Sequence, residues 1–189
     1  CGLVVKDSAS FSSGLANSLF SLSIRLSGLG DCGGAVKAIG EAIEIYRGLA
    51  EGGSEEGAAV FYPELARSLF NLCSWLYETG DYGGSVDAAW EAVEIYRELA
   101  VKNSATFSSE LASSLLNLSV CLFKVDDFLG AVGFAREAIE IYRGFAAKGS
   151  AAFSSELAES LFNLSTYLLG LEDCGGALEA AWEAVEIRN

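Results

Sequence analysis

Hydrophobic residues recur along this chain with the spacing of amphipathic helices, and these helices come in pairs. In the first segment of one pair, leucines recur at intervals of four, three and four residues: Leu65, Leu69, Leu72 and Leu76. This spacing places them on one face of a helix. A second amphipathic segment runs from about residue 85 to residue 100, and residues 79–84 (TGDYGG) separate the two. Glycine ends helices because it accepts positive φ angles, so the pattern predicts a helical hairpin.

The hairpin recurs through the whole chain. Its opening motif, Leu-Ala-x-Ser-Leu, begins at Leu15, Leu65, Leu111 and Leu157. A near-constant period of this length indicates an array in which each unit packs on its neighbours. The sequence therefore predicts an all-α fold of about four helix-turn-helix repeats.

The residues at fixed places in each unit resemble those of the tetratricopeptide repeat (TPR) family. In one copy the matching positions are Leu69, Leu72, Cys73, Leu76, Gly80, Tyr82, Ser85 and Ala92. The unit is longer than the usual TPR, and Arg47, Arg97 and Arg143 replace its closing proline. It is most similar to the long repeats of kinesin light chain-like proteins and of fungal signalling proteins. The resemblance implies a right-handed α-solenoid.

The repeat boundaries follow from aligning the copies. We expect the tail of a preceding repeat and a linker at 1–14, then repeats at 15–60, 61–106 and 107–152, and a truncated repeat at 153–189. The incomplete units at both ends suggest an excerpt of a longer array. Residues 51–58 contain three glycines, so we expect a long, mobile loop there. Serines after Phe107 and Phe153 are the predicted N-caps, and Pro63 is placed in a first helical turn.

Charge and composition exclude several functions. The net charge is −14, and the twelve Lys and Arg residues are scattered, which disfavours nucleic acid as a partner. No apolar run approaches the roughly 18 residues of a membrane span, so no membrane association is expected. Acidic residues occupy equivalent places in the second helices: Glu41, Glu44, Glu91, Glu94, Glu137, Glu140, Glu183 and Glu186. They form either an acidic stripe for a basic partner or a solvated outer face.

The residues that usually perform catalysis or bind metals are missing. There is no histidine, and no nucleophile, phosphate-binding or metal-binding motif occurs. The five cysteines form no CxxC pair, and we interpret Cys32, Cys73 and Cys174 as small buried hydrophobic residues. We therefore expect no enzyme activity, no cofactor and no metal, and a reducing, intracellular location in the cytoplasm.

The TPR resemblance implies where a partner would bind. In the family the first helix of each repeat lines a concave groove, and the matching apolar positions here are Phe20, Ile24, Phe70, Tyr77, Leu116, Val120, Phe123 and Phe162. The alternative is that these side chains pack against neighbouring first helices. Arg67 and Lys124 are isolated basic residues of the same surface, too few to clamp a terminal carboxylate.

Asparagine recurs at one position of this surface, as Asn71, Asn117 and Asn163. An amide has both a donor and an acceptor, so a row of them can bind the backbone of an extended peptide. Equivalent asparagines do this in kinesin light chain-like members, as the resemblance implies; the alternative is that they help neighbouring helices pack.

We therefore predict a protein-interaction module of a larger scaffold or signalling protein, binding a protein or extended peptide with apolar side chains. The alternative is an assembly element that associates head to tail into a filament.

Overall fold

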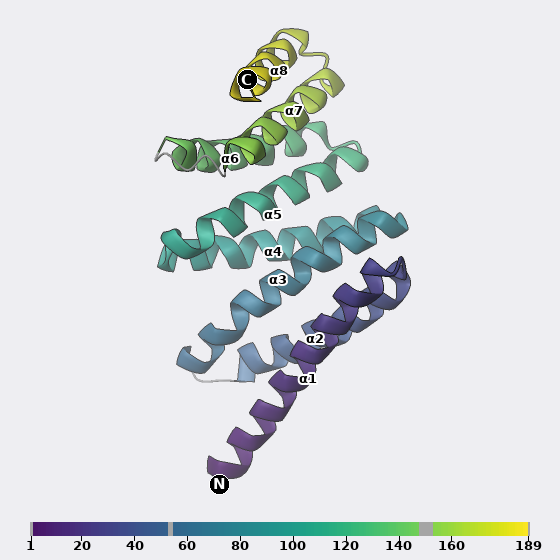
Figure 1. The fold of residues 1–189 in the computed structure, drawn as a ribbon, viewed down its shortest axis with the longest axis vertical. Helices are drawn as coiled ribbons and strands as arrows, with labels where there is room; N and C mark the ends of the chain where they lie inside the picture. The colour runs from purple at the N-terminus through teal and green to yellow at the C-terminus, as the bar shows by residue number, and fades with distance from the viewer. Residues whose placement is uncertain (1, 53–54, 148–152, 189) are drawn as a thin grey trace. The chain divides into compact units, whose positions relative to one another are not determined.

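The computed structural model describes residues 2–52, 55–147 and 153–188, and within these ranges the elements are eight helices in sequence order. They are α1 (Gly2–Gly28), α2 (Cys32–Gly52), α3 (Glu55–Thr79), α4 (Tyr82–Lys102), α5 (Ser104–Lys124), α6 (Phe128–Ala146), α7 (Ser154–Gly170) and α8 (Cys174–Arg188) (Figure 1). The predicted all-α array of about four helical hairpins is confirmed.

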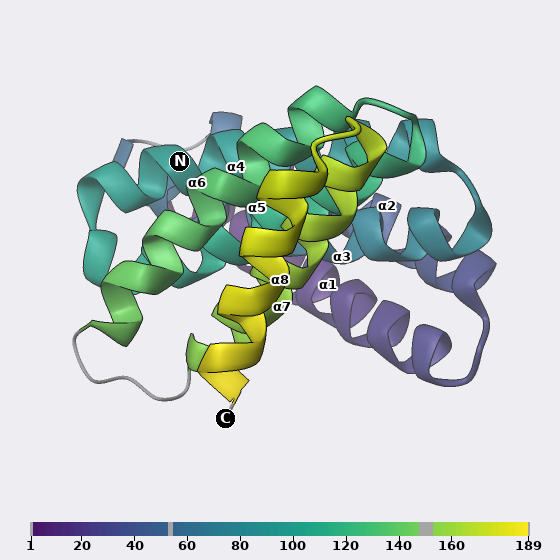
Figure 2. The same ribbon diagram turned by 90° about the horizontal axis from the view of Figure 1, so that it is seen from above.

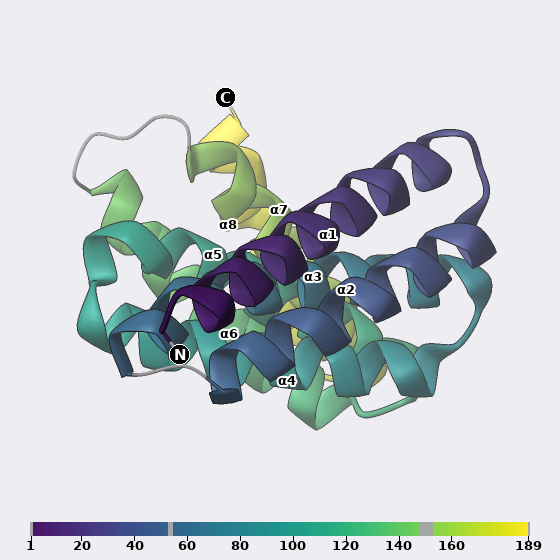
Figure 3. The same ribbon diagram turned by 90° about the horizontal axis from the view of Figure 1, so that it is seen from below.

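The chain divides into two compact units, Cys1–Ile95 and Tyr96–Asn189, and the division falls within α4. In the first unit α1 packs on α2, and α2 packs on α3; Figure 3 shows α1 and α2 side by side. In the second unit α5 packs on α6, α6 on α7 and α7 on α8, and α5 also contacts α7. Figure 2 shows the last hairpin, in which α7 and α8 lie side by side.

Small residues allow the two helices of a hairpin to approach closely. Ala42, Ala92 and Ala138 have no exposed surface, and Ala184 is buried as well. On the first helices the facing position is a buried serine or cysteine, as at Cys73. The Ser85 hydroxyl on α4 donates a hydrogen bond of 2.9 Å to the backbone carbonyl of Cys73 on α3. This close packing explains why the sequence repeats small side chains at fixed intervals.

The same turn chemistry starts every second helix. An aspartate accepts a hydrogen bond from the backbone N–H three residues later, as Asp81 does from Gly84 at 3.0 Å. Asp31, Asp127 and Asp173 make the equivalent bond, and in each case the side chain caps the helix.

One expectation about the hairpin turns needs correction. Gly80 has a φ of 85° and ends α3, as predicted. Gly83 and Gly84, however, lie in the first turn of α4 and not in the connection, because Asp81 caps the helix just before them. Gly33 and Gly34 occupy the same place in α2, and Gly175 and Gly176 in α8.

Two helices also begin earlier than the sequence predicted. Helix α5 begins at Ser104 because the Asn103 side chain accepts a hydrogen bond from the Thr106 backbone N–H, so the serines after Phe107 lie inside the helix. Pro63 lies inside α3, since that helix already begins at Glu55. At the third junction α7 begins at Ser154, but its N-cap is Phe153, which makes no side-chain capping hydrogen bond, so the predicted serine cap was wrong there as well.

The structure also bears on the N-terminal boundary and the expected loop. Helix α1 is continuous from Gly2 to Gly28 and crosses residue 14 without a break. Helix α2 ends at Gly52 and α3 begins at Glu55, so most of the segment 51–58 is helical. Residues 53 and 54 of the expected loop lie outside the described part of the chain.

Candidate protein-interaction surfaces

The three predicted asparagines lie at equivalent places on first helices. Asn71 is on α3, Asn117 on α5 and Asn163 on α7, and all three are half-buried. The Asn71 amide donates a hydrogen bond of 3.0 Å to the backbone carbonyl of Arg67 in its own helix. Each of the three residues thus keeps part of its surface exposed, and Asn71 already uses one of its donors.

The predicted apolar positions divide into covered and open ones. Phe20 on α1 is buried, and the Arg67 guanidinium lies 4.5 Å from its ring centroid. Phe123 on α5 is half-buried against Tyr167 of α7, with ring centroids 5.0 Å apart. At these two positions the alternative of helix–helix packing describes the structure. In both cases the first helix of the following repeat covers the ring: Arg67 of α3 lies over Phe20, and Tyr167 of α7 lies against Phe123.

The remaining members of the predicted surface are partly or fully open. Phe70, Tyr77, Leu116 and Val120 are half-buried, and Tyr77 makes an edge contact with Tyr82. Ile24 and Phe162 are exposed, Phe162 by 60% of its surface. The sequence did not distinguish these open positions from the covered ones, because all carry similar side chains.

The two basic residues of this surface are exposed. Arg67 forms an ion pair with Glu64 one turn earlier in α3 while its guanidinium lies over the Phe20 ring. Lys124 lies in the last turn of α5. Arg67 is therefore held in place by two contacts and is partly neutralised.

The second helices carry a row of ion pairs that sequence reasoning missed. Within the described ranges, an arginine of one second helix binds a glutamate of the next at 2.7–2.8 Å: Arg47 with Glu91, Arg97 with Glu137, and Arg143 with Glu183. Each pair has both carboxylate oxygens within hydrogen-bond distance of the guanidinium. We call these three pairs the Arg–Glu ladder.

The ladder changes the interpretation of the acidic positions. Glu91, Glu137 and Glu183 are half-buried and join neighbouring repeats. Hydrogen bonding to Glu183 raises the pKa of Arg143 above its ordinary value. The three arginines replace the closing proline of the TPR pattern, and the three glutamates occupy equivalent positions in the second helices. The recurrence of both residue types once per repeat is the sequence signal that could have revealed the ion pairs.

Buried tyrosines join the two helices of a repeat. The Tyr46 hydroxyl on α2 donates a hydrogen bond of 2.8 Å to Asn17 on α1, and the Tyr142 hydroxyl on α6 lies 3.0 Å from the Ser113 hydroxyl on α5. Burial raises the pKa of both tyrosines. These contacts fix the tilt of the hairpin helices and leave the hydroxyls inaccessible to a partner.

The cysteines do not behave alike. Cys73 is buried as predicted, but Cys32 is half-exposed and Cys174 is exposed, so the prediction was wrong for these two. Both begin a second helix directly after the turn of a hairpin. The Cys32 thiol donates a hydrogen bond of 3.1 Å to a Glu78 carboxylate oxygen, which raises the pKa of the thiol. Cys1 lies outside the described residues.

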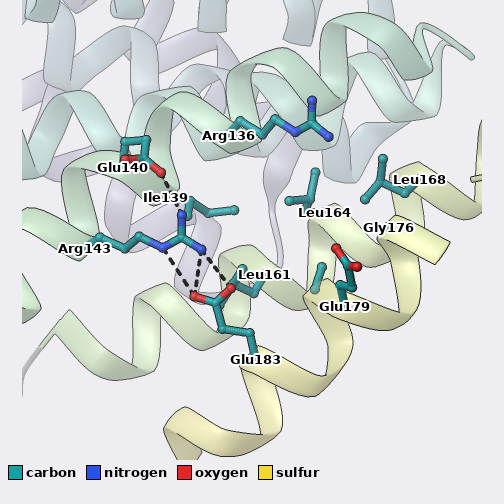
Figure 4. A pocket seen from close by; sticks show the side chains of 11 residues that line it. Arg136, Ile139, Glu140, Arg143, Leu161, Leu164, Leu168, Gly176, Glu179 and Glu183 are labelled. Atoms are coloured by element: carbon teal, nitrogen blue, oxygen red, sulfur yellow. Dashed lines mark hydrogen bonds and ion pairs between the residues drawn. The ribbon is translucent and has the colours of Figure 1, made fainter.

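A cavity of about 400 Å³ lies in the second unit, away from the predicted groove. Its walls come from α6, α7 and α8: Arg136, Ile139, Glu140, Arg143, Leu161, Leu164, Leu168, Gly176, Glu179, Ala180 and Glu183. Figure 4 shows the Arg143–Glu183 pair spanning it from α6 to α8. The leucines of its floor are almost fully buried, whereas Arg136, Glu140 and Glu179 on its walls are exposed, so the cavity is a partly open gap at the contact between two repeats.

The described residues include no helix with the length and hydrophobicity of a membrane span. They also include no group of three or more side chains arranged to hold a metal ion.

The comparisons with known proteins agree with this architecture. No curated protein sequence matches the chain. Among solved structures, the crystal structure of the apo form of RapI has a similar fold, with a TM-score of 0.74 and 18% sequence identity. The match covers 92% of this chain and 56% of that one, so this chain spans little more than half of RapI. At this identity the likeness shows the fold, and the kinesin light chain-like branch stays a prediction.

A family model matches in two successive places. The model described as Anaphase-promoting complex subunit 5 matches residues 6–54 and 51–109. The first match covers the α1–α2 hairpin, and the second covers α3, α4 and the start of α5. Together they include more than half of the chain. With its TPR-like helical hairpins, the chain belongs to the anaphase-promoting complex subunit 5 family.

Proposed function

We propose that this chain is a non-catalytic module that binds an extended segment of a partner protein along its first helices. The family to which it belongs is described as a subunit of a multi-protein complex, which supports a protein partner and an intracellular setting. We propose in addition a scaffold role within an anaphase-promoting complex, which the same description supports. With the repeat boundaries proposed from the sequence, each repeat contributes one first helix to this binding surface.

The observation that carries this proposal is the mixture of amide and apolar side chains left open on α7. Asn163 is half-buried, and Phe162 and Leu169 on the same helix are exposed by 60% and 58%. Phe162 and Leu169 are seven residues apart, nearly two helical turns, and so share a side of the helix. An amide beside open apolar side chains offers what an extended peptide requires: hydrogen bonds for its backbone and contacts for its side chains.

The neighbouring helix extends this surface within the same unit. Asn117 and the half-buried Val120 occupy on α5 the positions that Asn163 and Thr166 occupy on α7, and the two helices are in contact. Packed helices lie about 8–10 Å apart, so two equivalent amides on adjacent helices can bind peptide groups about three residues apart in one extended chain. In the first unit Asn71 on α3 provides the corresponding amide, beside the half-buried Phe70.

The charge of the chain restricts the chemistry of the partner. With a net charge of −14, the protein repels acidic segments at long range and attracts neutral or basic ones. We therefore expect the bound segment to be extended, to carry apolar side chains, and to contain lysine or arginine more often than aspartate or glutamate.

A displayed library of random peptides tests this proposal directly. Peptides selected on the wild-type protein should share apolar residues at alternate positions. The Asn117→Ala, Asn163→Ala double variant should bind them roughly 30-fold more weakly, if one hydrogen bond of about 1 kcal/mol is lost at each amide.

The matched control replaces an asparagine away from this surface. Asn103 caps α5 with its side chain, so Asn103→Ala should reduce stability while leaving peptide affinity unchanged. The proposal fails if the double variant keeps full affinity for the selected peptides, or if no peptide is selected on the wild-type protein while its helicity is intact.

A further inference from the structure

The cavity between α6, α7 and α8 has an apolar floor. Ile139 of α6, Leu161 and Leu164 of α7 and Ala180 of α8 line it, and each exposes 7% of its surface or less. The volume of about 400 Å³ lies within the usual range of ligand pockets, about 300–1,000 Å³. The walls are three consecutive helices of the array, so the cavity is a junction between two repeats and not an end face of the chain.

One repeat earlier, aromatic residues occupy two of the positions that line this cavity. Trp90 of α4 is equivalent to Arg136 of α6, and Phe134 of α6 is equivalent to Ala180 of α8. A small side chain in place of a large one leaves space unless the neighbours collapse into it. The junction of α6, α7 and α8 therefore has room for an aromatic ring that the chain itself supplies in the preceding repeat.

Two charged side chains at the mouth of the cavity are available to a ligand. Arg136 of α6 and Glu179 of α8 line it and are exposed. Neither forms an ion pair with any other residue of the described ranges. Figure 4 shows Arg136 on one side of Leu164 and Glu179 on the other. The Arg143 guanidinium, in contrast, is already bound to Glu183.

We propose that this cavity binds the indole ring of a tryptophan in a partner protein, next to a lysine or arginine of the same partner. A guanidinium stacks on the face of an aromatic ring, and tryptophan gives the strongest contact of this kind, so Arg136 can cover the indole. The leucines and Ala180 contact the rest of the ring. Buried tryptophan anchors of this type dominate the affinity of many protein interfaces. The site lies on the second-helix side and is additional to the surface of the proposed function.

The charges around the cavity favour a basic neighbour of that tryptophan. Its lining has two arginines and three glutamates, and the whole chain carries a charge of −14. Glu179 can accept hydrogen bonds from an ammonium or guanidinium group of the partner while Arg136 covers the ring. An acidic neighbour would be repelled by the carboxylates and by the net charge of the chain.

Fluorine NMR titrations with short peptides test the proposal. The probes are acetyl-Lys-Trp-Lys-amide, with a fluorine on the indole, and the matched peptide in which both lysines are replaced by glutamate, at a salt concentration of about 0.15 M. The basic peptide should shift and broaden its fluorine signal with a Kd in the millimolar range, as expected of so small a ligand. The acidic peptide should bind roughly tenfold more weakly.

Two variants fill the cavity with side chains that the array already uses. Ala180→Phe and Arg136→Trp introduce the residue types of Phe134 and Trp90 at the equivalent positions. Each should weaken binding of the basic peptide by roughly tenfold or more, because the ring of the variant occupies the space of the indole. Thermal unfolding identifies a variant that has lost its fold, and the other variant then decides the result.

Matched controls separate charge from shape. Glu179→Gln should remove most of the preference for the basic peptide. Glu186→Gln changes an exposed glutamate of the same helix that does not line the cavity, so it should leave the preference unchanged. All these variants keep Asn117 and Asn163, so peptides selected for the first-helix surface should bind them like wild type. Failure of this inference is therefore separate from failure of the proposed function.

Three results would overturn the inference. The first is an unchanged fluorine signal of the basic peptide at millimolar protein and peptide concentrations. The second is equal binding of that peptide to wild type and to a folded cavity-filled variant, which would place the peptide elsewhere on the acidic surface. The third is tighter binding of free fluorotryptamine than of the peptide, which would assign the cavity to a small aromatic amine and not to a protein.

Discussion

Two adjacent glycines in the first turn of α4 should respond differently to the same substitution. A methyl group on Gly83 would have the Asp81 carboxylate 3.9 Å away, an ordinary contact. A methyl group on Gly84 would lie 2.6 Å from an oxygen of the same carboxylate, which is too close. That carboxylate also accepts the capping hydrogen bond from the Gly84 N–H. Relieving the clash therefore requires the cap to move away.

The expected magnitudes follow from these two contacts. Alanine stabilises a helix by about 0.5–1 kcal/mol relative to glycine, so Gly83→Ala should increase the free energy of unfolding by that amount. Loss of an N-cap costs about 1 kcal/mol, so Gly84→Ala should be close to neutral and Asp81→Ala clearly destabilising. In the Asp81→Ala background, Gly84→Ala should become stabilising, because the carboxylate is gone.

Thermal unfolding followed by circular dichroism measures all four variants. For a chain of this length, 1 kcal/mol corresponds to a shift in Tm of about 2–4 °C. Gly83→Ala should raise Tm, Gly84→Ala should leave it within about 1 °C of wild type, and the double variant should recover most of the loss caused by Asp81→Ala. If Gly84→Ala raises Tm as much as Gly83→Ala does, the carboxylate does not constrain this glycine and the reasoning is refuted.

Three further predictions concern contacts between helices. Arg143→Ala should lower the free energy of unfolding by about 0.5–1 kcal/mol, because its pair with Glu183 is partly exposed, and urea titrations should show this cost shrinking at high salt. Tyr142→Phe should cost about 1 kcal/mol in the same titrations, since it removes a largely buried hydroxyl contact. Glu78→Gln should let iodoacetamide modify Cys32 faster at pH 8: the carboxylate raises the thiol pKa, and its removal increases the reactive thiolate.

Each of these has an outcome that contradicts it. A salt-independent loss in Arg143→Ala would mean that packing of the arginine stem, and not the ion pair, stabilises the junction. An unchanged midpoint in Tyr142→Phe would mean that the hydroxyl contributes nothing. Equal rates at Cys32 in wild type and Glu78→Gln, with the exposed Cys174 as the internal reference, would show that the hydrogen bond does not control the thiol.

The repeat pattern by itself determined the class of fold and the core of each hairpin. Leu65, Leu111 and Leu157 recur once per repeat and are buried, and the alanines predicted at the helix crossings have almost no exposed surface. The period of the hydrophobic side chains dictates which face of each helix is apolar, and the small side chains let the two helices of a hairpin approach closely.

Local hydrogen bonding decided where the helices begin. Asn103 caps α5 several residues before the serines that looked like caps, and Asp81 draws the two glycines after it into α4. The sequence contained these capping residues, but several residues nearby are equally able to cap a helix. Only the folded backbone shows which of them has its oxygen aimed at a free N–H.

The tertiary structure alone decided which similar side chains are open to a partner. Phe20 and Phe162 occupy the same position of the repeat, yet Arg67 covers the first while the second is exposed. Arg143 likewise contacts a glutamate 40 residues further along the chain. Helical periodicity defines a face of one helix, whereas exposure and pairing depend on the next repeat, and only packing brings these residues together.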